Sequence, residues 1–450
     1  MSENYNIFIP ELVPLENKGE EAIVRGIADV LFPDGNCEIH LFDEIEEYRF
    51  EDGIHVYPVK WFISPWLNRE FGLGVSYEKL RDSSYSILRN GLHKIYPNWV
   101  AKHCSALVKT NKILNQIHSG KAPSGEKEIR LKQLLDCDYI VAGHDGALDD
   151  RVCHVIDVFM NYGKKFGVFG VEFPLTFKSP AIINVLYSTL AKADFFYCRT
   201  EASHNVVNQN FPNIKSETLA DPAFGMKPVD SSVLNQIIGR NNLDEFFSKP
   251  VVMCTSCEPP PISRYCFEDI KTPDLKLSAH RDLYAELIKH IAERHDVNIL
   301  FLPHAIGPGK ALDDRIIAND ILKRSGLSED RARLLKDLLS GKELKALIGS
   351  AEFLVAERIH SMIGSVGVNT PFFVMGSKTD RRIKGIVCDM LQLQDNVYYL
   401  NNPSKDECIE HFEDVWSRKE DIQGRLQNTF HKMKDNLENK AKLMRKFIKH

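Results

Sequence analysis

Short apolar runs alternate with longer amphipathic segments along the chain, a pattern typical of repeated β-α units around parallel sheets. In the first half, buried strands are predicted at YNIFIPE (5–11), CEIHLFD (37–43), DYIVAGH (138–144), KFGVFGV (165–171) and DFFYCR (194–199). The segments GEEAIVRGIADVLF (19–32) and EASHNVVNQNF (201–211) have the helical period and follow two of these strands.

A second set of strands is predicted at PVVMCTS (250–256), VNILFLPH (297–304), EFLVAER (352–358) and PFFVMGS (371–377), with a helix at 280–295. The chain is therefore predicted to be an α/β protein with two Rossmann-like domains. We expect an N-terminal domain over 1–228, a C-terminal domain over 229–404 and a helical segment over 405–450.

The segment 60–127 does not fit the β-α alternation and predicts a mostly helical insertion in the first domain. It is rich in aromatic residues, as in WFISPWLNREF and YPNW. Such residues pack within an insertion in most proteins, and contact with a partner or a membrane is the alternative.

Composition narrows the class of protein. The 450 residues are 43% apolar and 26% charged, with a formal net charge of −5, which argues against a protein that wraps nucleic acid. No run of about 20 apolar residues predicts a membrane span, and the N-terminus has no signal-peptide pattern. Ten scattered cysteines, several inside apolar runs, indicate buried thiols in a reducing compartment, so we expect a cytoplasmic protein.

In the C-terminal segment, apolar residues recur at helical spacing while Lys and Arg occupy the other faces. A solvated basic face is the usual meaning of this pattern, with weak contact to an anionic membrane as the alternative.

Ligands of open parallel sheets bind beyond the carboxyl ends of the strands, so the residues at those ends are the candidates for chemistry. The first half offers NKGEEAI after the first strand, GHDGAL (143–148), Glu172 and Arg199. The second half offers His304 and Lys378. Taken alone, each of these is explained by a structural role at least as well as by ligand binding.

Arg358 and His360 stand out because they follow a predicted strand directly and precede the small-residue segment SMIGSVGVNTP. In a turn between strand and helix, residues two apart can face the same side, and a helix N-terminus there would add its dipole to the arginine charge. The pair predicts an anion site with a titratable group. A structural ion pair and a packed histidine are the alternative.

Other chemistries find little support. Cys254 and Cys257 lack a second ligand pair at zinc-finger spacing, and Cys266 does not complete a site. We expect no metal site and no cofactor, because no Walker, GxGxxG, GxSxG or HExxH motif is present.

Taken in order, these motifs resemble the polysaccharide pyruvyl transferase family. NKGEEAI is similar to its Asn-x-Gly-Asp-x-Ala loop, with Glu20 in place of Asp, and GHDGAL stands where the family has a glycine-rich turn. CRTEAS, ADPAF and ERIHSMIGSVGVNTPFF resemble its later motifs, and Lys378 lies where the family has a lysine.

The resemblance implies a GT-B-like fold and transfer of the enolpyruvyl group of phosphoenolpyruvate to a sugar hydroxyl pair. It assigns Arg199, Arg358 and Lys378 to phosphoenolpyruvate, and His360 to proton donation. Acceptor contacts would come from the opposite half, from Asn17, Gly19, Glu20, His144 and Asp145, with Glu172 and His304 as weaker candidates. The implied partners are phosphoenolpyruvate and a carbohydrate acceptor.

Two departures from the family pattern lie in the N-terminal half: GHDGAL lacks the triple glycine, and Glu172-Phe173 stands where glycine and isoleucine are usual. Two other functions stay open at this point. One is a GT-B glycosyltransferase using a nucleotide sugar, and the other is a non-catalytic glycan-binding scaffold. The acceptor sugar and the oligomeric state are not encoded in any motif.

Overall fold

A computed structural model of the chain describes residues 4–62, 105–146, 148–174, 177, 179–257, 259–307 and 312–448. The aromatic part of the predicted insertion, from residue 63 to 104, lies outside these residues. Its described remainder comprises the short helix η1 (Val59–Trp61), helix α4 (Ser105–His118) and the start of helix α5 (Glu126–Asp136).

The chain forms two compact units. Unit 1 contains Met1–Pro14, Ile27–Pro222 and Leu437–His450, and unit 2 contains Leu15–Gly26 and Ala223–Asn436. The change from unit 1 to unit 2 near residue 222 lies close to the predicted boundary at 228. The assignment of two segments differs from the prediction, because Leu15–Gly26 belongs to unit 2 and Leu437–His450 to unit 1.

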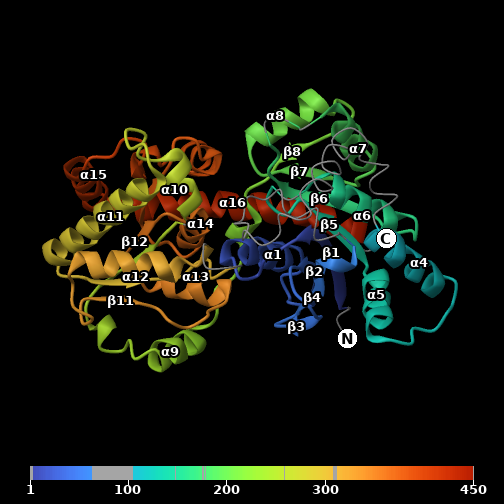
Figure 1. Cartoon of the computed structure of the whole chain (residues 1–450), viewed down its shortest axis with the longest axis horizontal. Coiled ribbons are helices and arrows are strands. Elements are labelled where there is room, and N and C mark those ends of the chain that lie inside the picture. The colour runs from blue at the N-terminus through green and yellow to red at the C-terminus, as the bar shows by residue number, and fades with distance from the viewer. Residues whose placement is uncertain are drawn as a thin grey trace. The chain divides into compact units, whose positions relative to one another are not determined.

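Among the described residues, unit 1 has an eight-stranded sheet in the order β3-β4-β2-β1-β5-β6-β7-β8 (Figure 1). All neighbouring strands are parallel except β3 and β4. The strands are β1 (Tyr5–Leu12), β2 (Cys37–Asp43), β3 (Arg49–Glu51), β4 (Ile54–Pro58), β5 (Tyr139–Ala142), β6 (Phe166–Val171), β7 (Phe196–Cys198) and β8 (Glu217–Thr218).

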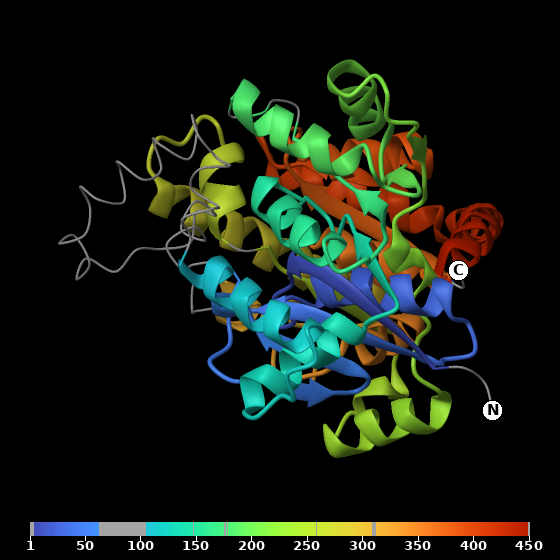
Figure 2. The ribbon, with the colours of Figure 1, turned by 90° about the vertical axis from the view of Figure 1, so that its right-hand side faces the viewer.

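The helices of unit 1 follow its strands in the β-α order that the sequence predicts. They are α1 (Lys18–Leu31), which begins in unit 2, and α4, α5, α6 (Asp150–Met160), α7 (Pro180–Leu190) and α8 (Glu201–Asn210). Figure 2 shows α4 and α5 in cyan beside the blue strands. The Arg130 guanidinium of α5 lies 3.7 Å from the centroid of the Tyr48 ring, which attaches this helix near the β3–β4 edge.

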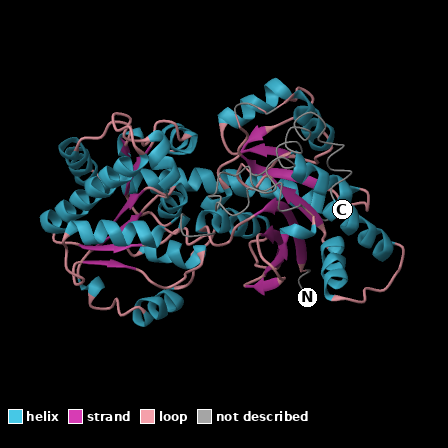
Figure 3. Ribbon diagram, viewed as in Figure 1, coloured by secondary structure: helices cyan, strands magenta, loops and turns pink. Residues whose placement is uncertain are grey.

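Unit 2 has a six-stranded sheet in the described residues, in the order β11-β10-β9-β12-β13-β14, and all its pairs are parallel. Its strands are β9 (Val251–Thr255), β10 (Asn298–Phe301), β11 (Ala332–Leu334), β12 (Phe353–Ala356), β13 (Phe372–Gly376) and β14 (Val397–Tyr399). Every residue of β9, β10 and β12 is buried, so both faces of the sheet centre are covered. Figure 3 shows these strands among helices.

The helices of unit 2 complete the β-α pattern. They are α9 (Ser231–Arg240), α10 (Pro259–Tyr265), α11 (Pro273–His295), α12 (Asp314–Ser325), α13 (Gly341–Gly349), α14 (Ile359–Gly367), the π-helix Ile383–Met390, α15 (Lys405–Ser417) and α16 (Lys419–Ile448), which continues into unit 1 from Leu437. The last two occupy the predicted C-terminal helical segment, and Met433, Leu437, Ala441, Met444 and Ile448 are buried as their spacing predicts.

The two Rossmann-like sheets confirm the predicted fold class, and each of the nine predicted strands is present. The strands β3, β4, β8, β11 and β14 were not predicted; each has at most five residues and lies toward an edge of its sheet. No helix in the described part of the chain is both long and apolar enough to cross a membrane.

Candidate active site

The central strands of unit 2 end in polar residues at one edge of the sheet. In the order β10-β9-β12, the residues beyond the carboxyl ends include His304, then Ser256, then Arg358 and His360. Parallel strands place all of these at the same edge. The sequence predicted this edge as the ligand-binding region, and its polar groups do gather there.

The turn after β12 sends neighbouring side chains in different directions. The side chain of Glu357 is 1% exposed, accepts a hydrogen bond from the Cys257 backbone N–H (2.8 Å) and contacts His280 Nε2 at 2.6 Å. Arg358 follows in an extended conformation as the N-cap residue of α14, and its Nε donates to the Ser256 carbonyl at 3.3 Å. The anchored glutamate therefore fixes the backbone from which Arg358 projects.

Asp314 holds both Arg358 and the loop that carries His304. The carboxylate is 1% exposed and pairs with Arg358 through two contacts, one of them Nε to Oδ2 at 3.2 Å. It also accepts the backbone N–H groups of His304 (3.0 Å) and Ala305 (2.8 Å). One buried carboxylate thus sets the relative positions of two strand-end loops.

The loop before α1 completes this edge, although the sequence had assigned it to the opposite half. The Lys18 backbone N–H donates to the His304 carbonyl at 2.8 Å, and Asn17 forms a β-bridge with Ala305. A Cβ atom added to Gly19 would overlap the Nδ1 atom of His360. Asn17 and Gly19 therefore lie with His304 and His360 in unit 2. Glu20 follows in the first turn of α1.

The electrostatics of this edge favour an anion. Burial, and then the positive charges of Arg358, His360 and Lys18, lower the pKa of His304 to about 3. Its imidazole is therefore neutral near pH 7. Of its cationic neighbours, Arg358 is paired with Asp314 and Lys18 with Glu21, the latter at 2.9 Å. The N-terminus of α14 adds its positive end to the same place. These features together can hold a phosphate or a carboxylate.

The corresponding edge of unit 1 is dominated by carboxylates. Arg199 is 1% exposed and faces Asp221 at 3.0 Å, Glu172 at 3.8 Å and Asp145. A guanidinium enclosed by three carboxylates offsets part of their negative charge within the protein. This arrangement supports a structural role for Arg199 more than the predicted contact with phosphoenolpyruvate.

Other residues of this edge support the same network. Thr200 donates to Glu172 at 2.8 Å, and its Oγ1 accepts the Ser203 backbone N–H as the N-cap of α8. His144 is buried beside Gly143, whose φ of +104° places it in a region that suits glycine. The Gly143 backbone N–H donates to Glu11, and burial raises the pKa of Glu11 to about 7.

Lys378 lies beyond β13, and its contacts differ from those of Arg358. Its backbone N–H donates to Asn401 Oδ1 at 2.9 Å, and its ammonium lies 5.8 Å from the centre of the Tyr399 ring. Among the described residues, no carboxylate lies within ion-pair distance of this ammonium.

Sequence reasoning missed Lys18, Asp314, Glu357 and Glu11. Lys18 stood inside the quoted NKGEEAI motif. Asp314 follows another aspartate before a helix, and the sequence pattern there indicates only a cap.

One group of described residues has metal-ligand chemistry: Glu38, His40 and His55 bring their ligand atoms within 4.8 Å of one another. His40 and His55 are neighbours in the β2–β4 register, and their rings stack at 4.3 Å with an interplanar angle of 5°. Lone pairs of stacked imidazoles lie in parallel planes and cannot converge on one ion. The four ring nitrogens also have hydrogen-bonding contacts, so we assign this cluster a structural role.

The close approach of Gly19 to His360 gives a first test. In Gly19→Ala, the added methyl group must displace the His360 ring, so we expect the imidazole NMR signals of His360 to shift. Gly424→Ala is the matched control, because nothing lies within 4 Å of its added Cβ and the His360 signals should stay in place. Unchanged signals in Gly19→Ala would contradict the contact.

Arg199→Met tests the structural role of that arginine. Removing the guanidinium leaves its buried carboxylates uncompensated, so we expect the free energy of unfolding to fall by about 3–5 kcal/mol. In the control Arg49→Met, a half-exposed ion pair is lost and the change should be under about 1 kcal/mol. Near wild-type stability of Arg199→Met in denaturant titrations would restore Arg199 as a ligand-binding candidate.

The pKa of His304 predicts a pH dependence of stability. Between its ordinary pKa of about 6.5 and its folded pKa of about 3, the unfolded chain binds a proton at His304 that the folded chain does not. The free energy of unfolding should therefore fall as the pH falls from 6.5 toward 4. In His304→Gln this decline should be shallower by up to about 1.4 kcal/mol per pH unit.

Denaturant titrations at several pH values would measure this slope. A part of the decline should remain in the variant, because burial also lowers the pKa of His40 to about 3. An identical slope in His304→Gln and wild type would show that His304 does not titrate in this way.

Comparisons with known proteins agree with this geometry. The family model described as polysaccharide pyruvyl transferase matches residues 17–379, from Asn17 to the residue after Lys378. No curated protein matches the chain significantly in sequence.

Solved structures resemble the chain in fold. A trehalose-6-phosphate synthase, OtsA, has a TM-score of 0.52 and 10% identity, covering 100% of this chain and 99% of its own. A UDP-forming α,α-trehalose-phosphate synthase from Burkholderia xenovorans has a TM-score of 0.52 and 10% identity. The match covers 99% of this chain and 100% of the synthase. Identity this low shows the fold alone, which is that of GT-B glycosyltransferases. With the family match over most of its length, the chain belongs to the polysaccharide pyruvyl transferase family and is a transferase.

Proposed function

We propose that this protein transfers the enolpyruvyl group of phosphoenolpyruvate to two hydroxyl groups of a sugar, forming a pyruvate ketal and releasing phosphate. Family membership supports the reaction type. The observation that carries the proposal is the edge of unit 2 where Arg358, His360 and the N-terminus of α14 come together with Lys18 and His304, through the contacts of Asp314 with Arg358 and His304 and of Gly19 with His360.

Phosphoenolpyruvate suits this edge because it carries both a phosphate and a carboxylate. An arginine held from one side by a carboxylate presents a fixed orientation to such a ligand, and guanidinium groups bind oxyanions through paired hydrogen bonds. Asp314 provides that fixed orientation for Arg358. Arg358 is the principal ligand of the anion in this scheme, and Lys18 is an additional cation.

The reaction requires three changes in bonding. A proton adds to the methylene carbon of phosphoenolpyruvate and converts it to a methyl group, which leaves a positive charge shared by C2 and its oxygen. One sugar hydroxyl attacks C2 and loses its proton. The second hydroxyl then replaces the phosphate as the C2–O bond to phosphate breaks. Of the two hydroxyl protons, one restores the acid and the other leaves with phosphate.

His360 is the proposed proton donor. Histidine exchanges protons near neutral pH, which matches a step that needs both an acid and its later recovery. The ring is 8% exposed and its Nδ1 atom faces Gly19, so its orientation is restricted. His304 is a poor acid in this setting, because its lowered pKa keeps the ring in the neutral form, which is a very weak acid.

In this scheme phosphoenolpyruvate is a co-substrate, and no metal or further cofactor takes part. We place the reaction in the cytoplasm, where phosphoenolpyruvate is made and where the free, buried thiols of Cys137, Cys153 and Cys254 would remain reduced.

Thermal unfolding with added ligands tests this proposal. Phosphoenolpyruvate at about 100 times its dissociation constant should stabilise the wild-type protein by ~2.7 kcal/mol, and Arg358→Ala should abolish the effect. The control Arg324→Ala removes a surface arginine that pairs with Asp282 and should keep the full stabilisation.

Nucleotide sugars form the second arm of the experiment. Stabilisation by a nucleotide sugar and none by phosphoenolpyruvate would make the protein a glycosyltransferase. No stabilisation by any ligand would favour a non-catalytic scaffold. Phosphate release from phosphoenolpyruvate that depends on an added glycan would then identify the acceptor.

A further inference from the structure

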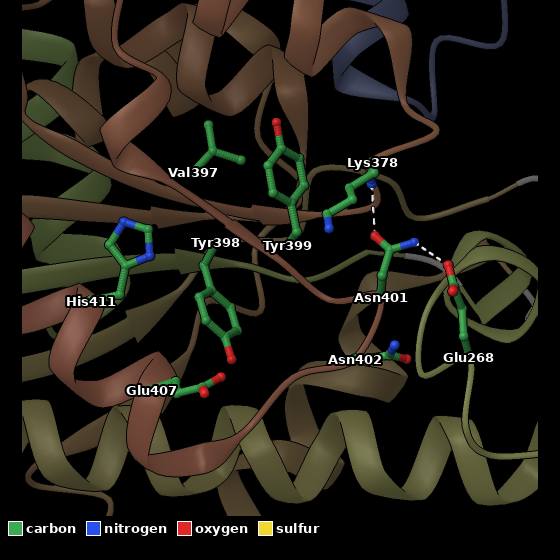
Figure 4. Close-up of a pocket in the computed structure, with 9 residues that line it drawn as sticks. All are labelled: Glu268, Lys378, Val397, Tyr398, Tyr399, Asn401, Asn402, Glu407 and His411. Carbon is green, nitrogen blue, oxygen red and sulfur yellow. Dashed lines mark hydrogen bonds between the residues drawn. The ribbon is translucent and has the colours of Figure 1, made fainter.

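A polar cavity of about 350 Å³ lies at the outer edge of the unit 2 sheet, beside β14 (Figure 4). Its walls come from the turn after β13, from β14 and its following loop, from the start of α15, and from the loop after α10. Its volume is at the small end of the range of about 300–1,000 Å³ for small-molecule sites, which suits a single sugar ring.

Asn401 makes this cavity a preformed site. Its side chain is 7% exposed, accepts the Lys378 backbone N–H at 2.9 Å, and donates to Glu268 and to the Tyr265 carbonyl. The Glu268 backbone N–H in turn donates to the Asn401 carbonyl at 2.6 Å. Three segments distant in sequence are therefore joined by one amide, and ordering them on ligand binding costs little.

A second anchor lies on the opposite wall. The Tyr398 hydroxyl donates to the Ser404 carbonyl at 2.9 Å and accepts the Ser404 backbone N–H at 3.0 Å. This fixes the loop that leads into α15, from which Glu407 and His411 contribute to the cavity. In Figure 4 the Tyr398 ring extends toward Glu407, with its hydroxyl near that carboxylate.

The charges of the cavity differ from those of the Arg358 edge. One cation, Lys378, stands against two carboxylates, Glu268 and Glu407. This balance disfavours a phosphate or a nucleotide, which the cationic edge around Arg358 would hold better. Carboxylates and amides bind hydroxyl groups well, and tyrosine rings pack against the apolar face of a sugar.

We propose that this cavity binds an uncharged pyranose ring of the carbohydrate acceptor, with Glu407 and Asn402 holding its hydroxyl groups beside Tyr398. This inference rests on the proposed pyruvyl transfer. It moves Lys378 from the phosphoenolpyruvate site to the sugar site, where its ammonium lies above the Tyr399 ring.

Saturation-transfer NMR and titration with methyl glycosides of glucose, galactose, mannose and their N-acetylamino analogues would test the site on the full chain. Glu407→Gln and Asn402→Ala change exposed side chains, so folding should be retained. Glu410→Gln is the matched control, because Glu410 is an exposed residue of the same helix that does not line the cavity.

We expect at least one glycoside to bind wild type and Glu410→Gln, with a dissociation constant about tenfold weaker in Glu407→Gln. Thermal stabilisation by phosphoenolpyruvate should be the same in all four proteins. In Arg358→Ala that stabilisation should be lost while glycoside binding persists.

Three results would overturn the sugar site: no glycoside binds wild type, glycosides bind the cavity variants as well as wild type, or Glu407→Gln loses the phosphoenolpyruvate effect. A different result separates this inference from the proposed function. Glycoside binding that depends on Glu407, without stabilisation by phosphoenolpyruvate in any variant, would retain the sugar site and reject pyruvyl transfer.

Discussion

The carboxylate of Asp314 organises the candidate active site, because three separate segments depend on it. It accepts the backbone N–H groups of His304 and Ala305 and pairs with Arg358. The loop that it fixes through Ala305 is the one with which Asn17 forms its bridge, and Gly19 then lies against His360. A carboxylate that is 1% exposed needs such partners, since an unpaired buried charge is costly. The stability of the fold and the orientation of the anion site therefore have the same origin.

In both sheets polar side chains gather beyond the carboxyl ends of the strands, but the charged groups at the two edges differ. In unit 2 the strand ends collect Arg358, His360 and Lys18 around a histidine that burial keeps neutral. In unit 1 the strand ends collect carboxylates, and Arg199 lies among them as a counter-charge. Fold topology determines where polar side chains gather, whereas the balance of charge determines what can bind there. An excess of carboxylates disfavours an anion such as phosphoenolpyruvate, so the proposed scheme uses unit 2 to bind the donor.

Much of the fold followed from hydrophobic periodicity, because buried parallel strands leave continuous apolar runs such as FLVA at 353–356. The spacing of Arg358 and His360 also identified the turn that carries both. The contact between Asn17 and Ala305 could not be predicted, since it joins residues far apart in sequence through backbone groups that carry no side-chain signature. The same holds for Arg199, because a strand-end arginine looks alike in sequence whether its partner is a substrate or a buried carboxylate. Edge strand β14 was not predicted, and the cavity beside Lys378 was missed with it.

The separation of charge within unit 2 also bears on how donor and acceptor would be distinguished. Phosphoenolpyruvate and a sugar ring differ most in charge, and their proposed sites differ in the same property. Arg358 and Lys18, each paired with a carboxylate, lie near His304, whereas two carboxylates accompany one lysine beside β14. A nucleotide-sugar donor is also anionic, and the acceptor in glycosyl transfer is also a neutral sugar, so the distribution of charge fits either reaction. What separates the two is the family to which the chain belongs. Membership of the polysaccharide pyruvyl transferase family is therefore the reason to prefer pyruvyl transfer on a fold that could serve either reaction.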